Sequence, residues 1–261
     1  MFPGPRFLFL FPLAALLACG SSPPSPSSST NNLSGNWEII SHLNSSGTIA
    51  DFTGALQSNG STVTGTFRAL ASNLTSNCPS ITTDLAVTGT LDASNNLTLT
   101  IPISGGTATI AATLPLDPQT FTQGSLQIVG GTCSMPSTAM NIVQFAPVTG
   151  TFTGTLTTSG TPAISASVTA VLVQSTTPNA DGQFPLTGTV TIQGPCSATL
   201  PLLPETVSGN GISFPTGSST SPASDLIGPL LTPTATSIQA YVDIYSTNCS
   251  ITYVQGTLTR Q

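Results

Sequence analysis

Residues 97–103 read LTLTIPI, and residues 238–244 read IQAYVDI. In both stretches an apolar side chain stands at every second position. A period of two places one set of side chains in a core and the other set in water, as in a half-buried β-strand. Residues 85–91 alternate in the same way, and no window longer than about ten residues has helical spacing. The sequence therefore predicts an all-β, antiparallel fold.

Tight-turn signals separate these runs. Asn, Asp and Gly tolerate the left-handed backbone that hairpin turns need. The pairs with this signal are Asn59-Gly60, Asn95-Asn96, Gly105-Gly106 and Asp181-Gly182. Interior glycines allow bulges and sharp curvature, which favours two similar curled sheets or small barrels. They stand at positions 65, 89, 150 and 188.

The N-terminal residues 1–18 are typical of a bacterial signal peptide. One cation, Arg6, precedes an apolar run that is too short to span a bilayer as a helix. The run ends in LLACG at positions 16–20, which resembles the lipobox of bacterial lipoproteins. In that family the cysteine receives a diacylglyceryl group, so the resemblance implies lipidation at Cys19.

Residues 19–32 form the expected lipidated tether. The segment GSSPPSPSSSTNN is uncharged and rich in Ser and Pro, a composition that behaves as a semi-extended linker. Gly20, rather than an aspartate, follows the cysteine, and in lipoproteins of Gram-negative bacteria this implies export to the outer membrane. The expected location is therefore the cell envelope, with the membrane as a partner through the acyl chain.

Charged residues make up only 5% of the chain, and lysine is absent. Nucleic-acid binding requires clustered Lys and Arg, so it is excluded as an expectation. Catalytic and metal-binding patterns are also lacking. His42 is the only histidine, and no Gly-x-Ser-x-Gly elbow occurs. One histidine cannot complete a zinc site if the cysteines are in disulfides. We expect a non-enzymatic protein without cofactor or metal.

The body of the chain contains an internal repeat. LSGNW at 33–37 returns as VTGTF at 148–152, and VTGTF at 63–67 returns as LTGTV at 186–190. The expected repeats are 33–146 and 147–261. Four cysteines besides Cys19 allow three disulfide connectivities. The repeat favours one disulfide within each half, which gives the pairs Cys78–Cys133 and Cys196–Cys249.

The opening NNLSGNWEIIS at 31–41 resembles the Gly-x-Trp first strand of lipocalin-like barrels. In that family the tryptophan, here Trp37, plugs the barrel floor, and an arginine from the last strand covers it. The first half ends in Gln144 and Phe145 without an arginine. Either the likeness is superficial, or Arg260 closes over Trp37 across both halves. A pair of immunoglobulin-like sandwiches is the competing architecture, because it also has short alternating strands and one disulfide per unit.

Two functions remain open. The first is a lipid-anchored cell-envelope protein of structural or interaction type. The alternative is a domain that binds a small ligand or a cell-wall or extracellular glycan. Tyrosines beside a carboxylate stack on sugar rings and form hydrogen bonds to hydroxyls. The candidate residues for such a site are Tyr241, Asp243 and Tyr245 on one strand, Tyr253 on the next, and Trp37.

Residues 215–236 interrupt the alternation of the second half with a Ser- and Pro-rich stretch around four apolar residues. Ser224 or Asp225 is suited to cap one helical turn there. The apolar residues would then cover an open barrel end or the junction between the halves, as a lid. The alternative is a surface loop over the nearest core edge.

Overall fold

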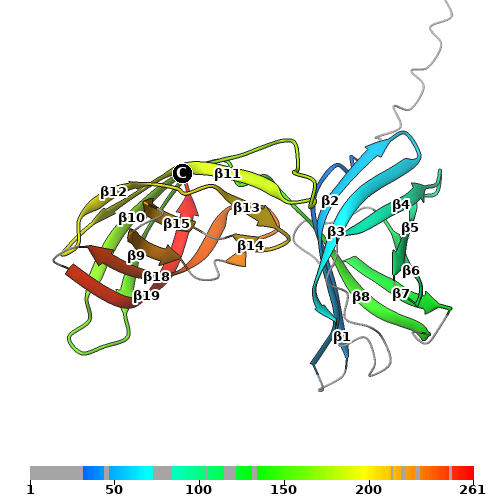
Figure 1. Ribbon diagram of the computed structural model, residues 1–261, viewed down its shortest axis with the longest axis horizontal. Coiled ribbons are helices and arrows are strands. Elements are labelled where there is room, and N and C mark those ends of the chain that lie inside the picture. The colour runs from blue at the N-terminus through cyan, green and yellow to red at the C-terminus, as the bar shows by residue number, and fades with distance from the viewer. Residues whose placement is uncertain are drawn as a thin grey trace, which may run out of the picture. The chain divides into compact units, whose positions relative to one another are not determined.

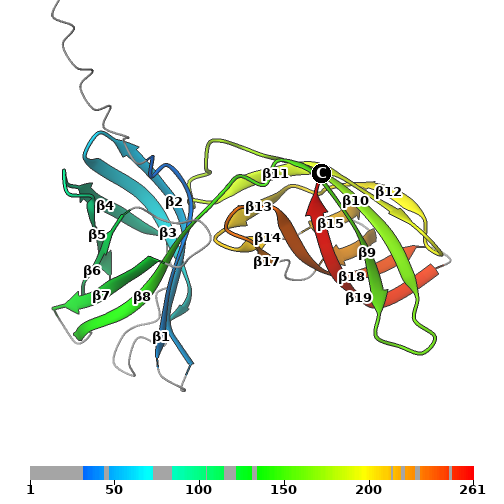
Figure 2. The ribbon, with the colours of Figure 1, turned by 180° about the vertical axis from the view of Figure 1, so that it is seen from behind.

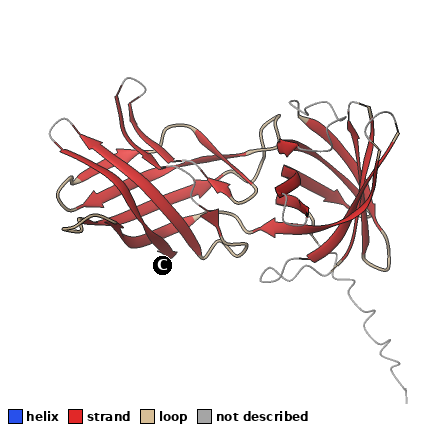
Figure 3. Ribbon diagram, turned by 90° about the horizontal axis from the view of Figure 1, so that it is seen from below, coloured by secondary structure: helices blue, strands red, loops and turns tan. Residues whose placement is uncertain are grey.

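The computed structural model describes residues 32–43, 47–72, 84–103, 105–114, 122–130, 134–212, 214–218, 221–226, 230–246 and 249–261. All the regular secondary structure of these residues is β-strand, and the strands pair antiparallel (Figure 3). The predicted all-β, antiparallel class is therefore confirmed. The strands form two sheets, and the chain passes from one to the other between Phe145 and Gly150.

The first sheet is a closed barrel in which each strand pairs with the next and β8 pairs with β1 (Figure 1). A barrel, rather than an immunoglobulin-like sandwich, is thus the architecture of the first half. Its strands are β1 (Gly35–Leu43), β2 (Gly47–Asn59), β3 (Thr62–Ser72), β4 (Leu85–Leu91), β5 (Asn96–Ile103), β6 (Gly106–Thr113), β7 (Thr122–Val129) and β8 (Met135–Phe145).

The second sheet curls back on itself. Its first strand, β9, pairs with both β10 and β19, and β19 also pairs with β18 (Figure 2). The β15–β16 hairpin extends the sheet beyond β18. Its strands are β9 (Gly150–Thr158), β10 (Ser165–Gln174), β11 (Phe184–Gln193), β12 (Ala198–Pro201), β13 (Glu205–Ser208), β14 (Gly211–Ile212), β15 (Phe214–Ser218), β16 (Ser221–Leu226), β17 (Leu230–Leu231), β18 (Ser237–Ser246) and β19 (Cys249–Arg260).

Alternation fills the interior of the barrel with apolar side chains. On β5, Leu97, Leu99 and Ile101 are buried, whereas Thr98 and Pro102 are exposed. Apolar side chains from all eight strands join them in one buried cluster. Burial of each large apolar side chain contributes about 2 kcal/mol. The described side chains inside the barrel therefore form one packed apolar core.

The four predicted turn pairs all lie in hairpins. Gly60, Asn95, Gly105 and Gly182 have φ between +62° and +85°. They connect β2 to β3, β4 to β5, β5 to β6, and β10 to β11. In the β4–β5 turn, the Asp92 carboxylate also accepts two backbone N–H groups at 2.8 Å. The turn residues therefore correctly predicted where these strands reverse direction.

Ser224 or Asp225 was expected to cap a helical turn in the segment 215–236, and this expectation is wrong. Ser224 and Asp225 belong to β16, which pairs with β15 on one side and β18 on the other. Short polar strands of this kind lack the alternating apolar pattern from which strands were predicted. The side chains of residues 213–231 lie outside the described ones, so the lid stays a prediction.

Candidate functional site

An aromatic plug is buried in each half. Trp37 on β1 and Phe152 on β9 are both 0% exposed. The indole Nε1–H of Trp37 donates a hydrogen bond to the carbonyl oxygen of Leu33 at 2.8 Å. The ring of Phe152 has no N–H to donate. Instead, the guanidinium of Arg260 lies 5.3 Å from the centroid of the Phe152 ring, where the ring attracts a cation.

The last strand of each half caps its plug with the same kind of contact. Gln144 on β8 and Arg260 on β19 each donate two hydrogen bonds to carbonyl oxygens, at 2.7–3.2 Å. Because Arg260 lies over Phe152, it does not close over Trp37 across both halves. The acceptors are Asn32 and Ser34 in the first half and Pro147 and Thr149 in the second, each 115 residues further along.

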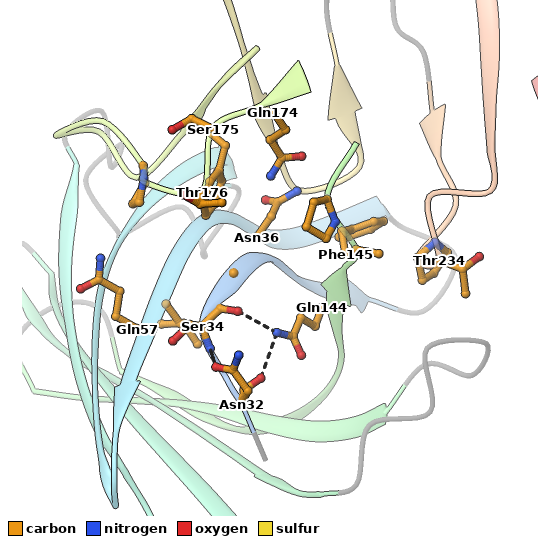
Figure 4. A pocket seen from close by; sticks show the side chains of 17 residues that line it. Asn32, Ser34, Asn36, Gln57, Gln144, Phe145, Gln174, Ser175, Thr176 and Thr234 are labelled. Carbon is orange, nitrogen blue, oxygen red and sulfur yellow. Dashed lines mark hydrogen bonds between the residues drawn. The ribbon is translucent and has the colours of Figure 1, made fainter. Parts of the chain in front are cut away.

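A pocket of about 660 Å³ lies beside these two caps (Figure 4). It lies outside the barrel core, and we call it the junction pocket because both halves line it. Flat apolar surfaces come from Phe145, Phe184 and three prolines, and hydroxyls come from serine and threonine. The carboxamides in its lining are Asn32, Asn36, Gln57, Gln144 and Gln174.

No charged side chain is among the described residues that line the junction pocket. Backbone groups hold several of the carboxamides in place, among them Gln174 and Gln144. Gln174 is 7% exposed, and its Oε1 accepts the Val148 N–H at 2.8 Å. Gln144 uses its Nε2 for the two capping hydrogen bonds, drawn as dashed lines in Figure 4. The pocket therefore offers fixed neutral donors and acceptors beside apolar surface, at the size usual for ligand sites.

Beside the pocket, the first barrel grips a tight turn of the second half. This junction turn, Ser208–Asn210, connects β13 to β14, and its Gly209 has a φ of +57°. Asn36 on β1 donates to the carbonyl of Gly209 and accepts its N–H, both at 2.7 Å. Ser208 donates to Thr53 Oγ1 at 2.8 Å. A Cβ on Gly209 would lie 2.5 Å from the Thr53 methyl group, so only glycine fits.

Glu38 completes this grip. Its side chain is 3% exposed, and its Oε2 accepts the Asn210 N–H at 2.7 Å. Burial is the main cause that raises the pKa of Glu38 to about 7. The hydrogen bond from the Asn210 N–H lowers this pKa, and the negative charge of Asp51 raises it further. Glu38 thus changes its charge near neutral pH.

A second contact between the halves involves carboxyl groups. Asp84, immediately before β4, forms an ion pair with Arg68 at 3.3 Å, and both side chains are more than a third exposed. Removal from water raises the pKa of Asp84, and a hydrogen bond with Asp181 of the β10–β11 loop raises it further, while Arg68 lowers it. At this exposure the ion pair itself is worth little.

The residues predicted to bind a ligand do not gather at the junction pocket. Trp37 is buried as a plug. Tyr241 is 45% exposed on β18, opposite Gln255 of β19, and it does not line the pocket. The side chains of the other three lie outside the described ones. Those residues are Asp243, Tyr245 and Tyr253.

Of the predicted disulfide cysteines, Cys196 is buried and disulfide-bonded. Its bonding partner is not among the described side chains, so both pairings stay predictions. Cys19, Cys78 and Cys133 lie outside the described residues. Cys249 begins β19, and its side chain is not described.

Sequence reasoning missed the carboxamides and Glu38. Their signal was weak, because Gln and Asn are ordinary residues on the solvent face of a strand. Glu38 follows the plug by one position, so alternation placed it outside the barrel and therefore in water. It does lie outside the barrel, but the junction turn covers it. Alternation reports which face a side chain is on, and not what lies over that face.

Within the described ranges, no three His, Cys, Asp or Glu side chains gather as a metal site would require. The same ranges contain no helix that is long and apolar enough to cross a membrane. No family model matches the chain, and neither a curated protein nor a solved structure matches it. The site must therefore be interpreted from its own chemistry.

Proposed function

We propose that this chain is a lipid-anchored cell-envelope protein of interaction type, and that its β-body binds an uncharged, hydroxyl-rich ligand such as a glycan segment. The observation that carries the ligand class is the junction pocket, which combines fixed carboxamides with phenylalanine and proline surfaces and has no charged lining residue. A neutral polyol matches such a lining, because carboxamides both donate to and accept from hydroxyls while apolar faces cover the sugar ring.

The proposed function includes no catalysis. The anchor rests on the lipobox that ends at Cys19 and on the Ser- and Pro-rich tether behind it. The tether ends at Asn32, which lines the junction pocket. A lipid on Cys19 would therefore hold the pocket within a linker's reach of the membrane surface.

The ligand class is tested by titrating neutral and acidic oligosaccharides of two to four sugar units into a secreted Cys19→Ser variant. We expect neutral oligosaccharides to bind more tightly than acidic ones, because no cation in the lining compensates an acidic sugar. Gln57→Ala removes an exposed carboxamide from the lining and should weaken binding about fivefold, the usual loss for one hydrogen bond.

The matched control is Gln239→Ala, which removes a carboxamide that is also exposed, on β18 outside the lining. It should leave the affinity unchanged. If Tyr241→Ala abolishes binding and Gln57→Ala has no effect, the sugar binds around Tyr241 on β18 and not in the junction pocket. If no neutral oligosaccharide binds at millimolar concentration, the ligand class is wrong.

The anchor is tested separately by growing the producing cells with a labelled fatty acid. The wild-type protein should take up the label and partition with membranes, whereas Cys19→Ala should remain unlabelled. Equal labelling of the two proteins would contradict the lipoprotein proposal, whatever the outcome of the sugar titration.

A further inference from the structure

Glu38 is buried by the other half of the protein and not by its own barrel. Its neighbours Trp37 and Ile39 point into the barrel core. Strand alternation therefore places Glu38 on the outer face, together with Asn36. Both are at most 3% exposed there. The cover is the junction turn, because Gly209 and Asn210 bond to these two side chains.

The surface around Glu38 is continuous with an apolar contact. Ala55 on β2 and Val143 and Phe145 on β8 also lie on the outer face of the barrel, and they pack in the core cluster of the second half. We call these three residues the outer patch. The outer patch is apolar, so its contribution to the contact between the halves does not change with pH. The contact of Glu38 with the junction turn does change with pH, because Glu38 can gain or lose a proton.

No described side chain on the elements packed against Glu38 is a cation, and His42 on the same strand has a side chain that lies outside the described ones. On the elements packed against it, the titratable groups are Asp51 on β2 and Glu205 on β13, both acids, while β8 and β14 have none. Asp51 raises the pKa of Glu38. An ionised Glu38 under the turn therefore lacks water and, among the described side chains, a counter-charge, and opening of the turn would return it to water.

We propose that the junction turn is a proton-sensitive clamp, which closes over protonated Glu38 and loosens when Glu38 ionises. The clamp also controls the proposed ligand site, because Asn36 both holds Gly209 and lines the junction pocket. This second step rests on the proposed function, whereas the clamp itself does not. The device would couple ligand retention to the acidity of the surroundings.

The clamp is tested without any ligand, by hydrogen exchange of the Gly209 and Asn210 amides in the Cys19→Ser chain. Exchange rates are corrected for the intrinsic pH dependence of amide exchange. Between about pH 5 and pH 8.5, we expect the corrected rate to rise at least about tenfold, because the shift of Glu38 favours the open turn as the proton leaves.

Glu38→Gln keeps an acceptor for the Asn210 N–H without a charge, so its corrected rate should not change with pH. Glu205→Gln is the matched control, because burial also raises the pKa of Glu205 but its side chain has no part in the grip. This variant should keep the wild-type response. An unchanged pH response in Glu38→Gln, or none in the wild type, would overturn the proposal.

A second variant covers the case in which Glu38→Gln does not fold. Asp51→Asn removes the charge that disfavours ionisation of Glu38, so the midpoint of the response should move to lower pH. An unmoved midpoint would contradict the assignment to Glu38. Failure of the sugar titration alongside a pH-dependent clamp would reject the ligand class and leave the clamp in place.

Discussion

At the scale of single residues, one contact to the backbone recurs in both halves with different side chains. In the first half, Ser58 Oγ accepts the Leu33 N–H at 3.3 Å. In the second half, the Gln174 carboxamide accepts the Val148 N–H at 2.8 Å. A hydroxyl and a carboxamide thus satisfy the same buried backbone donor, which would otherwise cost stability.

Arg260→Ala should lower the free energy of unfolding by about 2 kcal/mol, because it removes two hydrogen bonds to carbonyls and the contact with the Phe152 ring. Denaturant unfolding of the secreted chain measures the loss. Arg68→Ala is the control, since its exposed ion pair should contribute less than about 1 kcal/mol. Equal losses in the two variants would show that the cap is not a stabilising contact.

The free energy of unfolding should also depend on Glu38. The folded pKa of about 7 lies above the ordinary value of 4.5, so the folded state holds its proton more strongly than the unfolded chain. This contribution is complete below about pH 4.5 and is lost as pH rises through 7, in total on the order of 3 kcal/mol. A plot of the free energy of unfolding against pH should therefore have different slopes for the wild type and for Glu38→Gln between these two pH values. Parallel curves would contradict the prediction.

At the scale of strands, much of the fold could be predicted from the sequence. Alternation located β4, β5 and β18, and the turn residues located four hairpins. The shorter strands from β12 to β17 escaped, because two to six residues are too few to establish a period. Small barrels were among the predicted architectures, and the first sheet confirms this, because it closes through the pairing of Trp37 on β1 with Gln144 on β8.

The disulfides are predictions at this scale. We expect Cys78–Cys133 to connect the segment after β3 with the segment before β8, and Cys196–Cys249 to connect the turn before β12 with the start of β19. Each would stabilise the fold by about 2–4 kcal/mol through its closed loop. Peptide mapping under non-reducing conditions decides the pairing. A peptide that joins a cysteine of one half to a cysteine of the other would contradict it.

At the scale of the whole molecule, the surface that joins the two halves could not be predicted from any pattern in the sequence. The outer patch and Glu38 occupy positions that alternation assigns to solvent. Asn36 and Gln57 of the junction pocket do the same, whereas Gln174 belongs to the buried set of β10. The candidate site was therefore missed because it arises where two units meet, and the sequence reasoning treated each strand against its own sheet.

The first half expressed alone, as residues 19–146, should expose the outer patch. We expect this fragment to bind an apolar dye more strongly than the secreted chain, because Val143 and Phe145 lose their cover. Val143→Thr with Phe145→Thr should reduce dye binding by the fragment. If the fragment binds no more dye than the full body, the patch is not what joins the halves.

The junction also has a consequence for the order of events during synthesis. The chain is made from its N-terminus, and domains that emerge first fold first. If the first barrel closes before β13 and β14 dock, Glu38 is in water during that interval and has an ordinary pKa. Between about pH 4.5 and pH 7, docking of the junction turn should take up a proton, so the docked state should be more stable in an acidic compartment than in a neutral one.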